Sequence, residues 1–258
     1  MIKRVVLTRP SGPYSGTRRL ASKLESRGYD TRELPLFKCV AINITQNDRV
    51  EVLGMLQTFD CSWLVFLSPT AVWVWKDLIG KDADLLQATA KSKIATQGSG
   101  TATAVKECFN RNPDFVPSVF VAEEFAREFI GVLQKSECVV VPQSTEGRDV
   151  FVPLLVAAGF FAQGVGIYRL EVNQISSDEI IEYRRFVSSD TAIVFMSPSA
   201  ASAASLVLGG VLGTDKIISV GPITSQAIKQ AGLPVWREAK EHSEGGILQV
   251  LDEDRLHP

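Results

Sequence analysis

Histidine is the scarcest chemically useful residue in this 258-residue sequence, which contains only His242 and His257. Two histidines offer little basis for a Ser-His-Asp triad or for a histidine-rich zinc site. The glycine-rich phosphate loop G-x-x-x-x-G-K-[ST] is also missing. If the protein is an enzyme, we expect it to work without a histidine base and without a metal.

Strong net charge, paired cysteines and long apolar runs are missing as well. A net charge of −2 and a pI near 5.8 give no general basis for binding nucleic acid or an anionic membrane. Cys39, Cys61, Cys108 and Cys138 form no C-x-x-C pair, so we expect reduced, core-filling thiols. No apolar stretch reaches the roughly 18 residues of a membrane span. No secretory leader is visible, and we expect a cytoplasmic protein.

What the sequence does contain is a repeated unit. Residues 64–71 read LVFLSPTA, and residues 193–200 read IVFMSPSA. Each copy is a short apolar run, typical of a buried strand, that stops at Ser-Pro. We expect Ser68 and Ser197 to cap helices, with the following proline in the first helical position of each.

The rest of the chain repeats in the same order. Gly98 is followed three residues later by Thr101, and Gly221 three residues later by Thr224. Strands alternate with helices throughout, which predicts parallel sheets covered by helices on both faces. The fold class is therefore α/β, with two similar domains and a cleft between them.

Three segments receive weaker assignments. Residues 115–121 and 235–236 are predicted to be extended, and residues 148–158 are predicted to form a helix.

Ligands of open α/β sheets bind beyond the carboxyl ends of the strands. Here those ends are rich in Ser, Thr and Gly and precede helices, whose N-termini attract anions. The residues predicted to contact a ligand are Thr8, Arg9, Ser68, Pro69, Thr70, Ser99, Gly100, Thr101, Ser144, Arg148, Ser197, Ser199, Ile223 and Thr224. Each also has a structural interpretation: the serines can act as helix caps, the threonines can be structural, and the arginines can be solvated.

Residues 98–103, GSGTAT, imitate a dinucleotide-binding fingerprint. The third glycine is replaced by Thr103, and the corresponding segment of the second half, residues 221–224, lacks the second glycine. We therefore do not expect NAD to bind.

Several motifs, in their order and spacing, resemble the uroporphyrinogen-III synthase family along nearly the whole chain. They are Thr8-Arg9-Pro10, Ser68-Pro69, Gly98–Ala102 as Gly-x-x-Thr-Ala, Arg148 at the head of a helix, Ile167-Tyr168, Ser197-Pro198 and, more loosely, 221–225.

The resemblance changes the expected domain boundaries. A plain duplication would divide the chain near residue 136. The family instead implies a crossed arrangement, with residues 1–37 and 172–258 in one domain and residues 41–168 in the other. Residues 37–44 and 167–172 would then form a two-strand linker.

The resemblance also implies an activity, the cyclisation of hydroxymethylbilane to uroporphyrinogen III with loss of water and inversion of ring D. It implies no cofactor, a small-molecule substrate (a linear tetrapyrrole with many carboxylates), no nucleic acid or membrane partner, a monomer, and a transient contact with hydroxymethylbilane synthase. Tyr168 becomes the candidate general acid. Its alternative role is that of an aromatic side chain packed at the hinge.

Two other functions stay open at this point. One is a cytoplasmic two-domain protein that binds or senses a small anion without catalysis. The other is a glycosyltransferase that uses a nucleotide sugar, which the missing nucleotide-binding loop disfavours.

Overall fold

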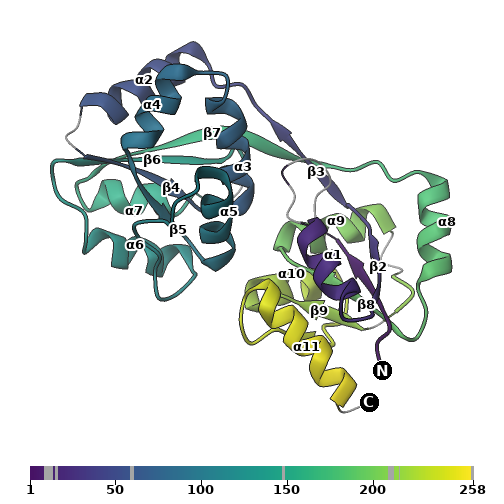
Figure 1. Cartoon of the computed structure of the whole chain (residues 1–258). Coiled ribbons are helices and arrows are strands. Elements are labelled where there is room, and N and C mark those ends of the chain that lie inside the picture. The colour runs from purple at the N-terminus through teal and green to yellow at the C-terminus, as the bar shows by residue number, and fades with distance from the viewer. Residues whose placement is uncertain are drawn as a thin grey trace. The chain divides into compact units, whose positions relative to one another are not determined.

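The computed structural model describes residues 1–8, 14, 17–58, 61–146, 149–208, 212–214 and 216–256. The chain divides into two compact units, shown in Figure 1. Unit 1 consists of Met1–Cys39 and Glu171–Pro258, and unit 2 is Val40–Leu170. Each unit contains a parallel sheet with helices packed on it, so the predicted fold class is confirmed.

Unit 1 is built on a sheet whose described strands have the order β10-β9-β8-β1-β2, all paired in parallel. Its elements are β1 (Arg4–Leu7), α1 (Thr17–Glu25), β2 (Asp30–Glu33), α8 (Ser177–Phe186), β8 (Thr191–Phe195), α9 (Pro198–Leu208), β9 (Ile217–Ser219), α10 (Pro222–Gln230), β10 (Arg237–Glu238) and α11 (Glu244–Leu256). The central strands β1, β8 and β9 are almost continuously apolar and buried, as strands covered on both faces must be. The edge strands β2 and β10 are polar, which discourages pairing with another chain.

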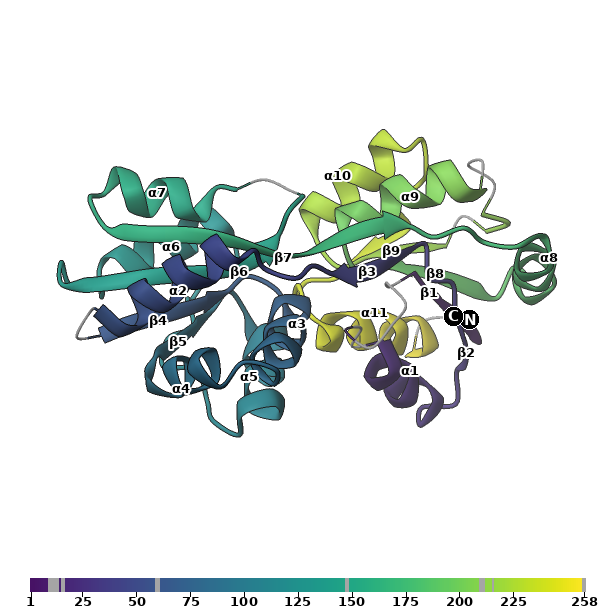
Figure 2. The same ribbon diagram turned by 90° about the horizontal axis from the view of Figure 1, so that it is seen from above.

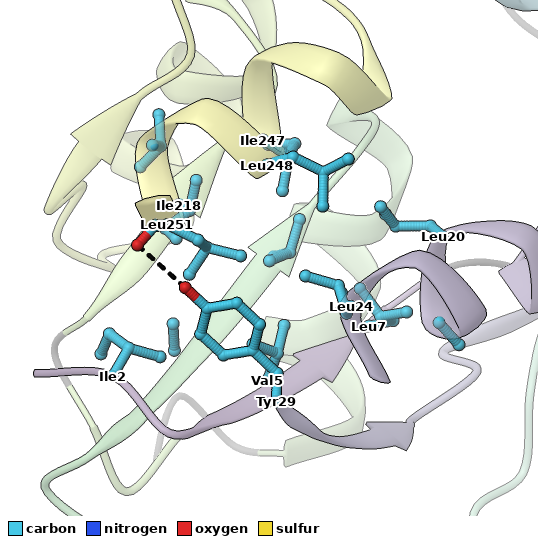
Figure 3. Close-up of a cluster of buried hydrophobic side chains, with 14 of the residues drawn as sticks. Ile2, Val5, Leu7, Leu20, Leu24, Tyr29, Ile218, Ile247, Leu248 and Leu251 are labelled. Atoms are coloured by element: carbon cyan, nitrogen blue, oxygen red, sulfur yellow. Dashed lines mark hydrogen bonds between the residues drawn. The ribbon is translucent and has the colours of Figure 1, made fainter. Parts of the chain in front are cut away.

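Alternate residues of the unit 1 strands face one core. Figure 2 shows α1 and α11 on one face of this sheet and α9 and α10 on the other. On the first face, Val5, Leu7 and Val194 pack against Leu24 of α1 and Leu251 of α11, as Figure 3 shows in part. Such burial contributes roughly 1.5–3 kcal/mol for each large apolar side chain.

Tyr29 forms a buried hydrogen bond within this core. Its hydroxyl donates to the carbonyl oxygen of Leu251 at 2.9 Å, the dashed line in Figure 3. Burial raises the pKa of the Tyr29 phenol, so this hydroxyl keeps its proton and remains a donor.

Unit 2 repeats the plan with the described strand order β3-β7-β6-β4-β5. Its elements, with the two strands that also reach unit 1, are β3 (Phe37–Ala41), α2 (Gln46–Thr58), β4 (Cys61–Phe66), α3 (Pro69–Ile79), α4 (Ala83–Lys91), β5 (Lys93–Thr96), α5 (Ser99–Phe109), α6 (Ala122–Ile130), β6 (Glu137–Ser144), α7 (Phe151–Ala157) and β7 (Phe161–Val172).

The core on one face of the unit 2 sheet is aromatic. Phe125 and Phe129 of α6 and Phe151 of α7 pack together and against Trp63 of β4. The ring of Trp63 meets the ring of Phe129 edge-on, with centroids 5.0 Å apart. Such aromatic pairs add about 0.5–1.5 kcal/mol beyond the area they bury. Helices α2 and α3 contact β4 and β6 on the opposite face.

Strands β3 and β7 pair with one another and carry the chain between the two units. In unit 1, the carbonyl oxygen of Leu36 accepts the main-chain N–H of Asn173 at 2.9 Å. In unit 2, the carbonyl oxygen of Ile167 accepts the main-chain N–H of Ile42 at 2.8 Å. The two connections are therefore equivalent in their backbone hydrogen bonding.

Several elements differ from the sequence prediction. Helix α4 was not predicted, although Asp82 caps it by accepting from the N–H groups of Asp84 and Leu85. Helix α7 begins at Phe151, three residues after the predicted start. Of the predicted extended segment 115–121, only Phe115 pairs, as an isolated bridge to Ala95. The strand predicted at 235–236 lies two residues later, as β10.

The described thiols and helices agree with two expectations. Cys39 and Cys108 are free thiols, and burial raises the pKa of Cys39 to about 11 and of Cys108 to about 12. Both thiols therefore stay neutral and fill space rather than act as nucleophiles. Among the residues that the structure describes, no helix has the length and apolarity needed to span a membrane.

Candidate active site

The first candidate region lies in unit 2, at the turn from β4 into α3. Ser68 has extended backbone angles, φ −150° and ψ 154°, and its Oγ accepts the N–H of Ala71 at 3.1 Å. Pro69 then opens α3, where its missing N–H removes no helical hydrogen bond. The predicted strand, cap and helix are all confirmed here.

Tyr168 reaches this turn from β7. Its side chain is only 7% exposed, and its hydroxyl lies 3.0 Å from Ser68 Oγ. β7 passes through Tyr168 and continues to Val172. The strand continues because β7 pairs with β3 beyond the point where β6 ends at Ser144, the register partner of Tyr168.

The chain that follows β6 forms a hydrogen bond with the backbone of Tyr168. The N–H of Thr145 donates to the carbonyl oxygen of Tyr168 at 2.9 Å. A Cβ at Gly166 would lie 2.6 Å from Thr145 Cγ2, and a Cβ at Gly164 would collide with the side-chain nitrogen of Gln143. The two glycines therefore leave room for the side chains of Gln143, in β6, and Thr145, just beyond it. Sequence reasoning missed this support, although Gly-x-Gly inside a strand is a signal of close approach.

The N-terminus of α5 lies beside the start of α3. Gly98 precedes α5 without a side-chain cap, and a Cβ at Gly100 would be 3.9 Å from Pro69 Cγ. Ser99 and Gly100 are exposed there, whereas Thr101 is buried. The side chain of Phe120, which was not predicted to be part of the site, packs against Gly98.

This edge of unit 2 combines a hydroxyl pair with two neighbouring helix N-termini. Positive ends of helices stabilise anions by roughly 0.3–1 kcal/mol each when exposed. A tyrosine hydroxyl can give up a proton in a transition state. The arrangement can therefore hold a carboxylate close to a proton donor.

The second candidate region is the corresponding edge of unit 1. Ser197 accepts the N–H of Ala200 at 3.3 Å, so its predicted capping role is also confirmed. Thr8 is buried, and its hydroxyl donates to the carbonyl oxygen of Val194 at 2.8 Å. This bond gives Thr8 a structural role at the end of β1.

The N-terminus of α10 completes that edge. Ser199 and Ile223 are exposed, while Thr224 is buried, as is its counterpart Thr101 in unit 2. In both helices the threonine is the third residue, so its side chain turns toward the core and only the main chain is left for a ligand. His242, which was also not predicted to be part of the site, lies against Gly221, where a Cβ would be 2.8 Å from its Cδ2.

Four predicted residues remain, namely Arg9, Arg148, Thr70 and Ser144. Arg9 and Arg148 lie outside the described residues. Thr70 is half-buried in the first turn of α3, and Ser144 Oγ accepts the N–H of Glu146 at 3.2 Å. Among the described residues, no cluster of three or more His, Cys, Asp or Glu side chains is placed to hold a metal ion.

Two known proteins are similar to this chain in sequence, each over most of its length. A protein of Methanocaldococcus jannaschii, provisionally assigned as a uroporphyrinogen-III synthase, is 25% identical over 96% of this chain and 97% of its own. The porphyrin biosynthesis protein HemD of Ruminiclostridium josui is 25% identical over 75% of this chain, which spans only 39% of that longer protein.

Known structures share the fold. The crystal structure of uroporphyrinogen-III synthetase from Helicobacter pylori superposes with a TM-score of 0.66 over 98% of this chain and 99% of its own, at 15% identity. A mutant uroporphyrinogen III synthase from Thermus thermophilus gives 0.57 with both chains fully covered, also at 15% identity.

The family-level comparison covers nearly the same length. Residues 18–249 match the family described as uroporphyrinogen-III synthase HemD. The matched stretch runs from α1 into α11. A match over this much of the chain includes both units and the two strands between them. The chain therefore belongs to the uroporphyrinogen-III synthase HemD family.

Proposed function

We propose that this protein cyclises hydroxymethylbilane to uroporphyrinogen III, with loss of water and inversion of ring D, in haem biosynthesis. The observation that carries the proposal is membership of the uroporphyrinogen-III synthase HemD family over residues 18–249. The family consists of cyclising enzymes of the lyase class. The geometry at the edges of the two sheets supports the same reaction.

The substrate matches the chemistry of these edges. A linear tetrapyrrole with many carboxylates needs several weak anion sites rather than one strong cation, and helix N-termini supply them. The starts of α3 and α5 lie side by side in unit 2, and Ser199 and Ile223 are exposed at the starts of α9 and α10 in unit 1.

The reaction itself asks the protein mainly for positioning. Electrons of the pyrrole ring expel the hydroxyl group, so the protein must hold the chain so that the last ring attacks through its substituted carbon. Holding two reacting groups in the right geometry can remove several kcal/mol from a barrier. We infer that Tyr168 donates a proton to the departing hydroxyl, because its own hydroxyl lies at the ligand-binding end of the sheet.

We also propose that the reaction needs no metal or cofactor. The pyrrole ring supplies the electrons, and a tyrosine supplies the proton. Exhaustive dialysis against a chelator is expected to leave turnover unchanged. A loss of turnover that is restored by a divalent cation would contradict this part of the proposal.

The decisive experiment is an isomer assay. Hydroxymethylbilane closes unaided to the type I isomer, so the purified protein is mixed with it and the oxidised products are separated by chromatography. We expect type III to predominate with the protein and type I without it. Type I alone in the presence of folded protein would overturn the proposal and favour a non-catalytic anion-binding protein.

A further inference from the structure

We propose that Ser68 is a positioning residue for Tyr168, orienting its hydroxyl and stabilising the phenolate formed when the proton leaves. This inference rests on the proposed function, because it assigns Ser68 a part in the same proton transfer. The contact that carries it joins Ser68 Oγ and the Tyr168 hydroxyl, 3.0 Å apart and 100 residues apart in sequence.

The direction of this hydrogen bond can reverse. Ser68 Oγ accepts the N–H of Ala71 at 3.1 Å, which occupies one of its two lone pairs. One lone pair and one hydrogen remain, so Ser68 can either accept from Tyr168 or donate to it. Without substrate, either hydroxyl can be the donor. When the departing hydroxyl takes the Tyr168 proton, Ser68 turns its hydrogen toward the phenolate oxygen.

The location of Ser68 favours the second arrangement. Ser68 caps α3, an eleven-residue helix whose positive end points at its oxygen through the N–H of Ala71. Accepting that N–H makes the Ser68 hydroxyl a better donor, since hydrogen bonds in a chain polarise one another. A phenolate at Tyr168 therefore gains a charge-assisted hydrogen bond inside a buried environment.

The proton balance of the step is closed. The carbon–oxygen bond of the hydroxymethyl group breaks, and the leaving oxygen takes the Tyr168 proton to become water. The last ring attacks the freed methylene through its substituted carbon, and the bond from that carbon to the neighbouring methylene bridge then breaks. The unsubstituted carbon of the same ring bonds to that methylene and loses its proton, which returns to the phenolate. Ser68 keeps its hydrogen throughout and only changes its direction.

In unit 1, the residue equivalent to Tyr168 has no hydroxyl group that could bond to the capping serine. The residue that follows Ile167 in unit 2 is Tyr168, whereas the residue that follows the equivalent Leu36 in unit 1 is Phe37. Phenylalanine carries no hydroxyl, so Phe37 cannot form such a bond with a serine. The role is therefore specific to Ser68 and does not extend to every Ser-Pro turn.

A double-mutant cycle tests the proposal. Ser68→Ala is expected to lower kcat for the formation of uroporphyrinogen III about tenfold, with KM nearly unchanged. A loss of this size corresponds to one hydrogen bond to a charged group. In a Tyr168→Phe background, the same change is expected to alter kcat less than about twofold, because the partner hydroxyl is gone. Ser68→Thr keeps the hydroxyl and is expected to retain most of the activity.

A control separates this role from the loss of a helix cap. Ser176 caps α8 in unit 1 through a capping box, and Ser176→Ala removes a comparable cap elsewhere in the fold. It is expected to leave kcat unchanged. Equal losses of kcat from Ser68→Ala with and without the Tyr168 hydroxyl would overturn the proposal.

A spectroscopic measurement separates failure of this inference from failure of the proposed function. The sequence has four tyrosines, so labelling their Cζ atoms with ¹³C gives few signals, and Tyr168→Phe identifies the relevant one. Ser68→Ala is expected to shift that signal, and Ser176→Ala is not. An unmoved signal refutes the contact whatever the activity, whereas a moved signal without type III product leaves the contact intact and refutes the proposed function.

Discussion

The two places where the chain crosses between units share a backbone and differ in chemistry. At each, a carbonyl oxygen accepts one main-chain N–H, from Asn173 to Leu36 in unit 1 and from Ile42 to Ile167 in unit 2. The next residue is Phe37 in one and Tyr168 in the other, and both are buried. Only the second brings a hydroxyl group to the end of a sheet.

The residue before the accepting carbonyl group also differs between the two crossings. Pro35 precedes Leu36, whereas Gly166 precedes Ile167. Glycine at 166 leaves room for Thr145, whose N–H holds the carbonyl oxygen of Tyr168. The two crossings thus share their backbone hydrogen bonding but differ in their side chains, while a serine caps a helix in both units.

Removing the hydroxyl of Tyr168 should have the largest effect. Tyr168→Phe is expected to lower turnover about 100-fold, as loss of a general acid does, with the fold intact by circular dichroism. Tyr29→Phe is the matched control, because it removes a buried hydroxyl from unit 1 and should reduce stability without reducing turnover. Unchanged turnover in Tyr168→Phe would remove this residue from the mechanism.

Filling the space at Gly166 should have the next largest effect. Gly166→Val forces Thr145 away from β7 and is expected to cost about 1–3 kcal/mol of stability, as overpacking does. Turnover should also fall, because Thr145 holds the backbone of Tyr168. Pro35→Ala in unit 1 keeps the carbonyl oxygen that accepts from the side chain of Asn173 and should leave turnover nearly unchanged. Equal losses in both variants would mean that the two crossings are functionally alike.

Removing the two caps should show where the units agree. Ser68→Ala and Ser197→Ala are each expected to destabilise their own unit by about 1 kcal/mol, the usual cost of losing an N-cap. Urea unfolding followed by tryptophan fluorescence can separate them, because Trp63, Trp73 and Trp75 lie in unit 2 and Trp236 lies in unit 1. A loss confined to one variant would show that the caps are not equivalent.

The smallest difference concerns acid stability. A hydrogen bond from Arg49 is the largest cause of the lowered pKa of Asp82 in unit 2, whereas one from Ser188 is the largest cause for Asp190 in unit 1. A lowered carboxyl pKa contributes stability above the unfolded pKa, and that stability is lost as the pH falls through the folded pKa.

Arg49→Gln should therefore destabilise unit 2 at neutral pH, and the difference from wild type should vanish in strong acid. Arg4→Gln in unit 1 should do less, because Ser188 still donates to Asp190. Urea midpoints measured across acidic pH provide the test. A larger effect of Arg4→Gln would reverse the expected order.

Much of the fold could be predicted because its signals are local. The apolar runs of β4 and β8, the Ser-Pro turns and the glycine-terminated helices all lie within a few residues of the structures that they specify. Helix α4 was missed because it is short, nine residues, and follows α3 after a brief turn at whose end Asp82 caps it. The same limit moved the start of α7 and the position of β10 by two or three residues.

The candidate site could be predicted only in part. Ser68 and Ser197 were recognised, and Tyr168 was found through a resemblance to a family rather than from its own surroundings. The contacts of Gln143, Thr145 and Phe120 were missed because polar and aromatic side chains in strands and loops carry no periodic signal. Their partners are glycines on other elements, at positions that depend on strand order.

By itself the sequence determined the strand, cap and helix units, since capping and proline geometry act over three or four residues. The tertiary structure alone decided that Ser68 meets Tyr168, because that pairing requires β6 to lie between β4 and β7. It also decided that Thr145 lies over Gly166, through the register of β6 on β7. Register and strand order arise from contacts between residues far apart in the chain, which no local pattern specifies.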